Sequence, residues 1–186
     1  LNEKKYHVGT FTSPHILRYN ERIKINGIEI DDESLLETFE MIDEVRGDTT
    51  LTYFEFATLS AFYLFSKSNL DVAVLEVGLG GRLDATNIVD SDISIITSIG
   101  IDHTEFLGNT IDSIALEKAG VMRPFKKCIY AQEKPPAAIL KYAKNKSVKL
   151  LIHNNDYQVN IGSSNWSLKS KHNFINDIPN LKMIGD

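Results

Sequence analysis

Hydrophobic and polar positions follow two periods along the chain, and these periods predict strands and helices in turn. Short apolar or alternating runs, which predict strands, occupy residues 6–11, 22–30, 71–77, 92–99, 127–131 and 148–152, and a period near two returns over 157–171. Apolar positions at helical spacing occupy residues 35–45, 52–66, 110–122 and 135–146. Strands that alternate with helices predict an α/β fold, with a mostly parallel sheet and helices on both faces.

Local signals predict where the turns and helices begin and end. Asn26-Gly27 is a turn signal inside the 22–30 run, which predicts a small hairpin. Asp31 or Asp32 can cap the first helix, and Gly47 stops it. Thr52 and Glu55 form a capping box at the start of the second helix. Because that helix is apolar in nearly all directions, we expect it to be buried in a layered domain.

Three polar clusters follow predicted strands directly. They are Ser13-Pro14-His15, the stretch from Glu76 to Asn87, and Asp102-His103. Ligands of an open parallel sheet bind beyond the carboxyl ends of its strands. We therefore expect the three clusters to meet at one edge of the sheet and to form the functional site.

Glu76 closes an apolar strand and so delivers a carboxylate to that edge. Mg²⁺ prefers hard oxygen ligands of this kind, and the alternative is a strand-end glutamate in a salt bridge. Glycines at 78, 80 and 81 follow, but Leu83 stands where a dinucleotide fingerprint needs its third glycine. These glycines fit either a tight turn or a loop that approaches a ligand closely, and the polar residues from Arg82 to Asn87 suit the second interpretation.

His103 and Lys118 are the remaining candidates. The position of His103 after a strand favours a ligand or phosphate contact over an ordinary surface histidine. For Lys118, on the next helix, the pattern alone favours a solvated lysine paired with a nearby acid. The role of His15 stays open, and the other histidines, which have no such placement, are read as structural or surface residues.

Composition narrows the class of protein. The chain has 186 residues, 42% of them hydrophobic, which suits one globular domain. A net charge of -5 without a basic cluster argues against a nucleic-acid partner. The apolar stretches are too short to cross a membrane. Cys128, the single cysteine, excludes an internal disulfide and fits the cytoplasm.

The run from Leu75 to Asn87, LEVGLGGRLDATN, resembles the signature of the folylpolyglutamate synthase and dihydrofolate synthase family, which is similar to the Mur ligases. Four further segments agree in the family's order, and the resemblance covers residues 8–121. These segments are Phe11 to His15, Asn20 to Ile23, Leu51 to Glu55, and Asp102-His103 with Leu107-Gly108 and Glu117 to Gly120.

The resemblance implies roles for particular residues. Ser13 and Glu76 would bind one Mg²⁺, His103 would bind a second, and Lys118 would be carbamylated; Glu76, His103 and Lys118 would be catalytic. A carbamate makes chemical sense, because a free ammonium, with a pKa of about 10.4, repels Mg²⁺ whereas a carbamate offers anionic oxygens. The residues that match pterin-contacting segments are Thr52, Tyr53, Phe54, Glu55, Leu83, Asp84 and Ala85.

The resemblance also implies a reaction. ATP would phosphorylate a carboxylate of folate or dihydropteroate, and the amine of L-glutamate would attack the acyl phosphate and form an amide. Such a protein is expected to be a cytoplasmic monomer with small-molecule substrates and no nucleic-acid or membrane partner. Electrostatic stabilisation of the transferring phosphoryl group is the main task of the site.

The sequence departs from the family at both ends. It contains no G-x-x-x-x-G-K-[ST] motif, and the family carries this P-loop before the segment that matches Ser13. We therefore expect residues 1–186 to be a partial central ATP-binding domain, without the P-loop segment and the C-terminal domain, and inactive alone. The alternatives are a Mur-type ligase of cell-wall precursors, a nicotinamide-dependent dehydrogenase domain, and a non-catalytic remnant. The intact set of Ser13, Glu76, His103 and Lys118 argues against the remnant.

Overall fold

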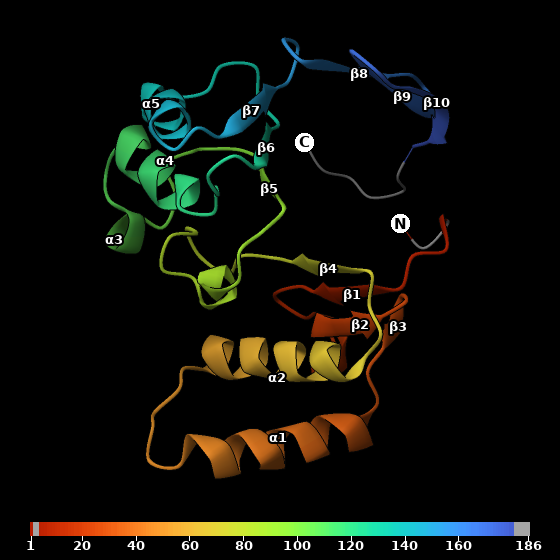
Figure 1. Cartoon of the computed structure of the whole chain (residues 1–186), viewed down its shortest axis with the longest axis vertical. Helices are drawn as coiled ribbons and strands as arrows, with labels where there is room; N and C mark the ends of the chain where they lie inside the picture. Colours follow the sequence, from red (N-terminus) through yellow and green to blue (C-terminus); the bar gives the residue numbers. More distant parts are fainter. Residues whose placement is uncertain (2–3, 181–186) are drawn as a thin grey trace. The chain divides into compact units, whose positions relative to one another are not determined.

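The chain folds into two compact units. The computed structural model describes residue 1 and residues 4–180 (Figure 1). The first unit comprises Leu1–Leu79 and Leu83–Val89, and the second comprises Gly80–Arg82 and Asp90–Asp186. The short segment Gly80–Arg82 thus belongs to the second unit although the residues on either side of it belong to the first.

The first unit is built on a sheet with the strand order β3-β2-β1-β4. Its strands are β1 (Val8–Phe11), β2 (Ile23–Ile25), β3 (Ile28–Glu29) and β4 (Val72–Leu75). A 3-10 helix, η2 (Tyr19–Arg22), precedes β2, and a second, η3 (Ala85–Ile88), follows β4. β4 runs parallel to β1, whereas β2 is antiparallel to both β1 and β3. The predicted hairpin is confirmed, because Asn26 and Gly27 both take the left-handed conformation of its turn.

Two helices of this unit begin at the predicted caps. For α1 (Asp32–Arg46), Asp31 accepts from the backbone N–H of Ser34 at 2.8 Å. For α2 (Tyr53–Lys67), Thr52 Oγ1 accepts from the N–H of Glu55 at 3.2 Å, and Glu55 Oε2 accepts from the N–H of Thr52 at 2.7 Å. Both predicted caps are confirmed, and Gly47 ends α1 as expected.

The core of the first unit lies between the sheet and α2. Figure 1 shows α2 between the sheet and α1, so the unit has three layers. The prediction that α2 is buried on all sides is wrong for Leu59, which is 41% exposed. The helix packs on the sheet and on α1, and the side facing neither stays open. The buried apolar residues are Phe11, Ile23, Leu35, Ala57, Ala61, Leu64 and Phe65.

The second unit contains a parallel sheet, β5 (Ile93–Ile96), β6 (Lys127–Tyr130) and β7 (Lys149–Ile152), in that order. Helices α4 (Ile111–Ala119) and α5 (Ala137–Asn145) connect the strands, after a short helix α3 (Thr104–Leu107). The α/β class with parallel strands is therefore confirmed. On β5, Ile96 is buried in the core while Ile93 and Ile95 are 56% and 60% exposed. The buried core residues are Ile96, Ala115, Ala119, Met122, Cys128, Tyr130, Ile139 and Ala143.

An antiparallel sheet of β8 (Tyr157–Ile161), β9 (Asn165–Ser170) and β10 (Phe174–Pro179) ends the described chain. The predicted hairpin corresponds to β8 and β9. β10 was not predicted; its pairing register shifts between Ile175 and Ile178, and Asp177 between them has a positive φ of 54°. Among the described residues, none of the helices has the length and apolar character that a membrane crossing needs.

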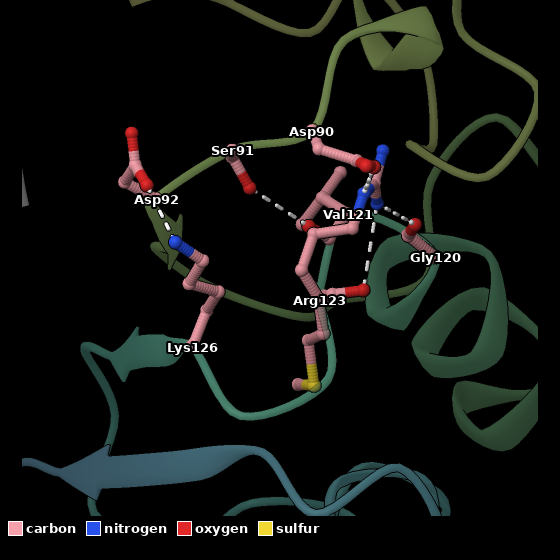
Figure 2. Close-up of polar contacts among 8 residues, drawn as sticks. Asp90, Ser91, Asp92, Gly120, Val121, Arg123 and Lys126 are labelled. Carbon is pink, nitrogen blue, oxygen red and sulfur yellow. Dashed lines mark hydrogen bonds and ion pairs between the residues drawn. The ribbon is translucent and has the colours of Figure 1, made fainter.

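Polar contacts connect the residues just before β5 with the turn between α4 and β6 (Figure 2). Arg123 binds Asp90 and also donates to the carbonyl of Gly120 at 3.1 Å. Lys126 pairs with Asp92 at 2.7 Å. These contacts hold the amino ends of β5 and β6 in register within the second unit.

Candidate active site

The loops after β1 and β4 place Ser13 and Glu76 side by side. Phe11, at the end of β1, lies opposite Leu75, at the end of β4. The backbone N–H of Glu76 donates to the carbonyl of Phe11 at 2.9 Å. The backbone N–H of Ser13 donates to Glu76 Oε2 at 2.7 Å, and the Ser13–Pro14 peptide bond is cis. The predicted meeting of these first two polar clusters at one sheet edge is confirmed.

The Glu76 carboxylate is exposed, and no ion pair engages it among the residues that the structure describes. The alternative interpretation, a strand-end glutamate in a salt bridge, is therefore not supported. An exposed carboxylate beside a serine at the carboxyl ends of parallel strands is a donor set of hard oxygens. The metal role of these two residues therefore stays a prediction.

Asp84 organises the loop that follows β4. Its Oδ2 accepts from the backbone N–H groups of Gly78 and Leu79 at 2.9 and 3.0 Å. Its Oδ1 accepts from the N–H of Thr86 at 2.9 Å and from the Thr86 hydroxyl at 2.6 Å. Both carboxylate oxygens thus hold the loop closed, and any substrate contact by Asp84 has to share them.

The start of α2 packs against this loop. The Phe54 ring lies 5.7 Å from the ring of Phe11 and covers Gly78, where an added Cβ would lie 2.7 Å from Phe54 Cζ. Only glycine fits at position 78 without moving that ring. α2 also contacts η3, so the two segments predicted to bind the pterin, residues 52–55 and 83–85, belong to the same unit.

Exposed apolar surface in these segments comes from Tyr53 and Leu83, which are 60% and 79% exposed, whereas Ala85 is half-buried. The Glu55 carboxylate is occupied by the N–H of Thr52, and that bond holds its pKa below the ordinary value. Tyr53 also lines a cavity of about 310 Å³ beside the start of α2. The lining residues are Tyr19, Phe39, Arg46, Leu51, Thr52, Tyr53 and Phe56.

His103 lies in the second unit, where it precedes α3. Its backbone is left-handed, with φ 49° and ψ 42°, which is uncommon for a residue other than glycine and occurs often at functional sites. Its Nε2 lies 3.5 Å from Asp102 Oδ2, and its ring is 58% exposed. The side chain is therefore accessible to a ligand, with a carboxylate beside it.

Lys118 lies near the end of α4 and is half-buried. The acid next to it in sequence, Glu117, is bound instead by Arg82, with Nη2 to Oε1 at 2.9 Å. Among the described residues no acid pairs with Lys118. The interpretation of Lys118 as a lysine neutralised by a nearby acid is therefore not supported.

Ser13 and Glu76 are the only predicted site residues that a hydrogen bond joins across the fold within the described ranges. No group of three or more His, Cys, Asp or Glu side chains could hold a metal ion in the part of the chain that the structure describes. The metal roles of His103 and Lys118 therefore stay predictions.

Sequence reasoning did not find the contacts around Glu21 and Arg22. Glu21 accepts three backbone N–H groups of the loop after Ser13, those of residues 16, 17 and 18, at 2.7–2.8 Å. Arg22 donates from Nε to His15 Nδ1 at 2.8 Å. The segment from Asn20 to Ile23 matched the family in sequence, but nothing in the local pattern indicates which loop these side chains hold.

Fold and site together define an α/β protein whose parallel strands deliver a carboxylate and a serine loop to one edge, as in proteins that transfer phosphoryl groups. The chain belongs to the Mur ligase middle domain family, which matches residues 16–180. The similarity to the Mur ligases seen in the sequence is thereby confirmed.

Comparison with individual relatives is more specific than the family match. The chain is 42% identical over 174 residues to the dihydrofolate synthase/folylpolyglutamate synthase of Escherichia coli, a match that covers 94% of this chain and 41% of that protein. It is 44% identical over 144 residues to the protein of the same name from Bacillus subtilis, covering 74% of this chain and 34% of that protein. The chain thus spans well under half the length of these relatives.

Solved structures agree. Escherichia coli FolC in complex with DHPP and ADP superimposes with a TM-score of 0.89 at 42% identity, covering 94% of this chain and 42% of that one. The bifunctional folylpolyglutamate synthase/dihydrofolate synthase of Yersinia pestis, complexed with AMPPNP and Mn, gives 0.87 at 43% identity, covering 94% and 42%. Both likenesses extend over nearly all of the present chain.

Proposed function

We propose that the whole protein is an ATP-dependent ligase that joins L-glutamate to a folate-type acid, acting as a dihydrofolate synthase, a folylpolyglutamate synthase or both. The observation that carries the proposal is the contact between Ser13 and Glu76 at the ends of two parallel strands. It lies in the part of the chain that is 42% identical to the Escherichia coli enzyme of that name. Related structures hold AMPPNP, Mn and L-glutamate.

Ser13 and Glu76 would hold the Mg²⁺ that accompanies the nucleotide. Mg²⁺ takes oxygen ligands and keeps several waters, and an exposed carboxylate next to a serine provides such a site. When bound, the ion would neutralise charge on the phosphate oxygens. His103 would hold a second Mg²⁺, together with Lys118 as its carbamate. Within the described part of the chain no acid pairs with Lys118, which supports that assignment.

The remaining roles follow from the substrates. ATP would phosphorylate the carboxylate of the folate-type acid, and the resulting acyl phosphate would be attacked by the amine of L-glutamate, releasing phosphate. The exposed rings and side chains at Tyr53 and Leu83, with Thr52, Phe54, Glu55, Asp84 and Ala85 around them, would contact the pterin. Asp84 would act chiefly by keeping the loop after β4 in shape.

We also propose that residues 1–186 are part of the central ATP-binding domain, and that the whole protein is a cytoplasmic monomer. The match covers 41% of the Escherichia coli relative, which supports the interpretation of residues 1–186 as one part of a longer protein. The chain lacks the motif G-x-x-x-x-G-K-[ST], so we expect residues 1–186 alone to be inactive.

The proposal is tested by glutamate-dependent ADP release from the whole protein. Dihydropteroate and tetrahydrofolate are supplied in turn, with Mg²⁺ and with bicarbonate to carbamylate Lys118. We expect release with at least one of them, and Glu76→Ala should lower the rate by about 100-fold or more, the size typical of one lost transition-state contact. The control is Glu40→Ala, which removes an exposed carboxylate of α1.

Release with neither pterin compound from a folded protein would contradict the folate assignment. Release with a cell-wall precursor instead would show a Mur-type ligase. An equal loss of the ADP-release rate in Glu76→Ala and Glu40→Ala would show that Glu76 is not an active-site residue. It would not contradict the proposed reaction.

A further inference from the structure

Arg22 is a buried cation that has no anionic partner among the residues the structure describes. It lies at the end of η2, next to β2, and is 7% exposed. Side chains of this charge are seldom so buried unless a carboxylate or another anion is paired with them. No ion pair of Arg22 occurs among the residues that the structure describes.

The acids nearby in sequence and fold are engaged elsewhere. Glu21 is bound by three backbone N–H groups. Asp32 is paired with Arg18. Glu55 caps α2. None of these carboxylates is free to approach Arg22, so the charge of the guanidinium is not compensated within this part of the fold.

Neutral groups hold the guanidinium in place. Its Nε donates to His15 Nδ1 at 2.8 Å, so the His15 ring carries its proton on Nε2 and contributes no negative charge. Its Cζ lies 5.2 Å from the Tyr53 ring centroid and 5.8 Å from that of Tyr19. Burial raises the pKa of Tyr19 to about 12, so this phenol also stays neutral. The two Nη groups make no hydrogen bond to any described residue.

Two aromatic rings connect this guanidinium with a cavity. Tyr19 and Tyr53, the two rings that flank Arg22, both line the cavity of about 310 Å³ beside the start of α2. Arg22 itself is not among the lining residues, and Arg46, the cation that does line the cavity, is paired with Asp43. A volume of this size admits an aromatic ring. His15 and Ser13 lie on the same loop, so the cavity and the Ser13–Glu76 pair belong to one unit.

We propose that Arg22 binds the carboxylate of the folate-type substrate, with the aryl ring next to that carboxylate lying against Tyr19 and Tyr53. A guanidinium presents a planar pair of N–H donors that matches a carboxylate. The negative charge of the bound carboxylate would balance the positive charge of Arg22. Aromatic walls suit an aryl acid better than they suit a phosphate. The identity of the acid rests on the proposed function, whereas the unpaired cation and the aromatic cavity do not.

The test is equilibrium binding of pteroate and of its neutral carboxamide to the whole protein, without nucleotide. The wild type should bind the acid about tenfold or more tighter than the amide, since hydrogen bonds to a charged group have that effect. Arg22→Gln should remove this preference and leave the affinity for the amide within about twofold. Arg22→Lys should keep part of it. Arg18→Gln, which removes the same charge from an exposed neighbour, should change neither affinity.

Several outcomes would overturn the proposal. Equal losses for acid and amide in Arg22→Gln would show a purely structural role, and if that variant does not fold, Arg22→Lys decides on the same comparison. A loss of MgADP affinity with unchanged pteroate affinity would show that the anion is a phosphate. If the wild type binds neither pteroate nor its amide, the folate assignment itself fails, whereas binding of both without any preference removes only the role of Arg22.

Discussion

Glu21 shows how one side chain can fix the geometry of a functional loop. Its carboxylate gathers three backbone N–H groups of residues 16–18, directly after Ser13 and His15. These bonds lower the pKa of Glu21 from 4.5 to about 2, with the N–H of Ile16 as the largest cause. The loop that carries Ser13 is therefore held by a charge that is present throughout the neutral range.

This contact predicts a pH dependence of folding. The folded-state pKa of Glu21 is below its unfolded value, so its stabilising contribution is full above about pH 4.5 and is lost as the pH falls towards about 2. We expect Glu21→Gln to lower the free energy of unfolding at pH 6, with the difference from the wild type shrinking across that window. Urea titrations at several pH values measure it.

Glu40→Gln is the matched control, because Glu40 is exposed on α1 and accepts no such N–H bonds among the described residues. A Glu21→Gln difference that stays constant between pH 6 and pH 2 would show that the three bonds do not depend on the carboxylate charge.

At the scale of single elements, local signals predicted most of the structure. Asp31, Thr52 and the Asn26-Gly27 turn act through backbone groups within a few residues, so their sequence patterns are sufficient to place them. β10 could not be found in this way. Its apolar positions do not alternate, because most of its side chains are exposed and its register shifts at Asp177.

The candidate site was predictable only in part, for a related reason. Ser13 and Glu76 were found because parallel neighbours bring their carboxyl ends together, which is a rule of topology. The contact of Arg22 with His15, Tyr19 and Tyr53 joins segments through space by side-chain packing. No periodicity encodes such a contact.

Thr52 has two expected roles, as the cap of α2 and as a substrate contact, and substitutions at this residue can distinguish them. Thr52→Ala removes the acceptor for the N–H of Glu55, so we expect a loss of about 1 kcal/mol in the free energy of unfolding. Thr50→Ala, at an exposed position before the cap, should change it by less than about 0.5 kcal/mol. Chemical denaturation measures both.

If Thr52→Ala keeps wild-type stability, the capping box contributes nothing and Thr52 is left with substrate binding as its only role. Thr52→Ser, which retains the hydroxyl acceptor, should restore most of the stability that the alanine variant loses.

At the scale of the whole molecule, the segment Gly80–Arg82 is where the chain enters the second unit before it returns to the first. Arg82 pairs with Glu117 on α4, and its N–H donates to the Glu117 carbonyl at 2.8 Å. At the end of α4, Gly120 approaches so closely that an added Cβ would lie 2.4 Å from Arg82 Cα. Position 120 therefore requires glycine for space, since its φ of -59° suits any residue.

This close approach predicts that Gly120→Ala displaces the segment. We expect it to lower the free energy of unfolding by about 1–3 kcal/mol, the usual cost of overpacking. Gly100→Ala is the control, because nothing lies within 4 Å of a Cβ added there. It should leave the stability unchanged or raise it slightly, since alanine restricts the unfolded chain. Equal effects of the two substitutions would contradict the packing explanation.

The same segment limits how such a protein can be rearranged by recombination. The chain passes between its units after Leu79, after Arg82 and after Val89. A crossover at any one of these points gives at least one piece that lacks residues belonging to its own unit. A crossover after Val89, for example, leaves Gly80–Arg82 on the amino-terminal piece although they complete the second unit. A single crossover between two relatives therefore gives a chimera in which at least one unit is composed of residues from both parents.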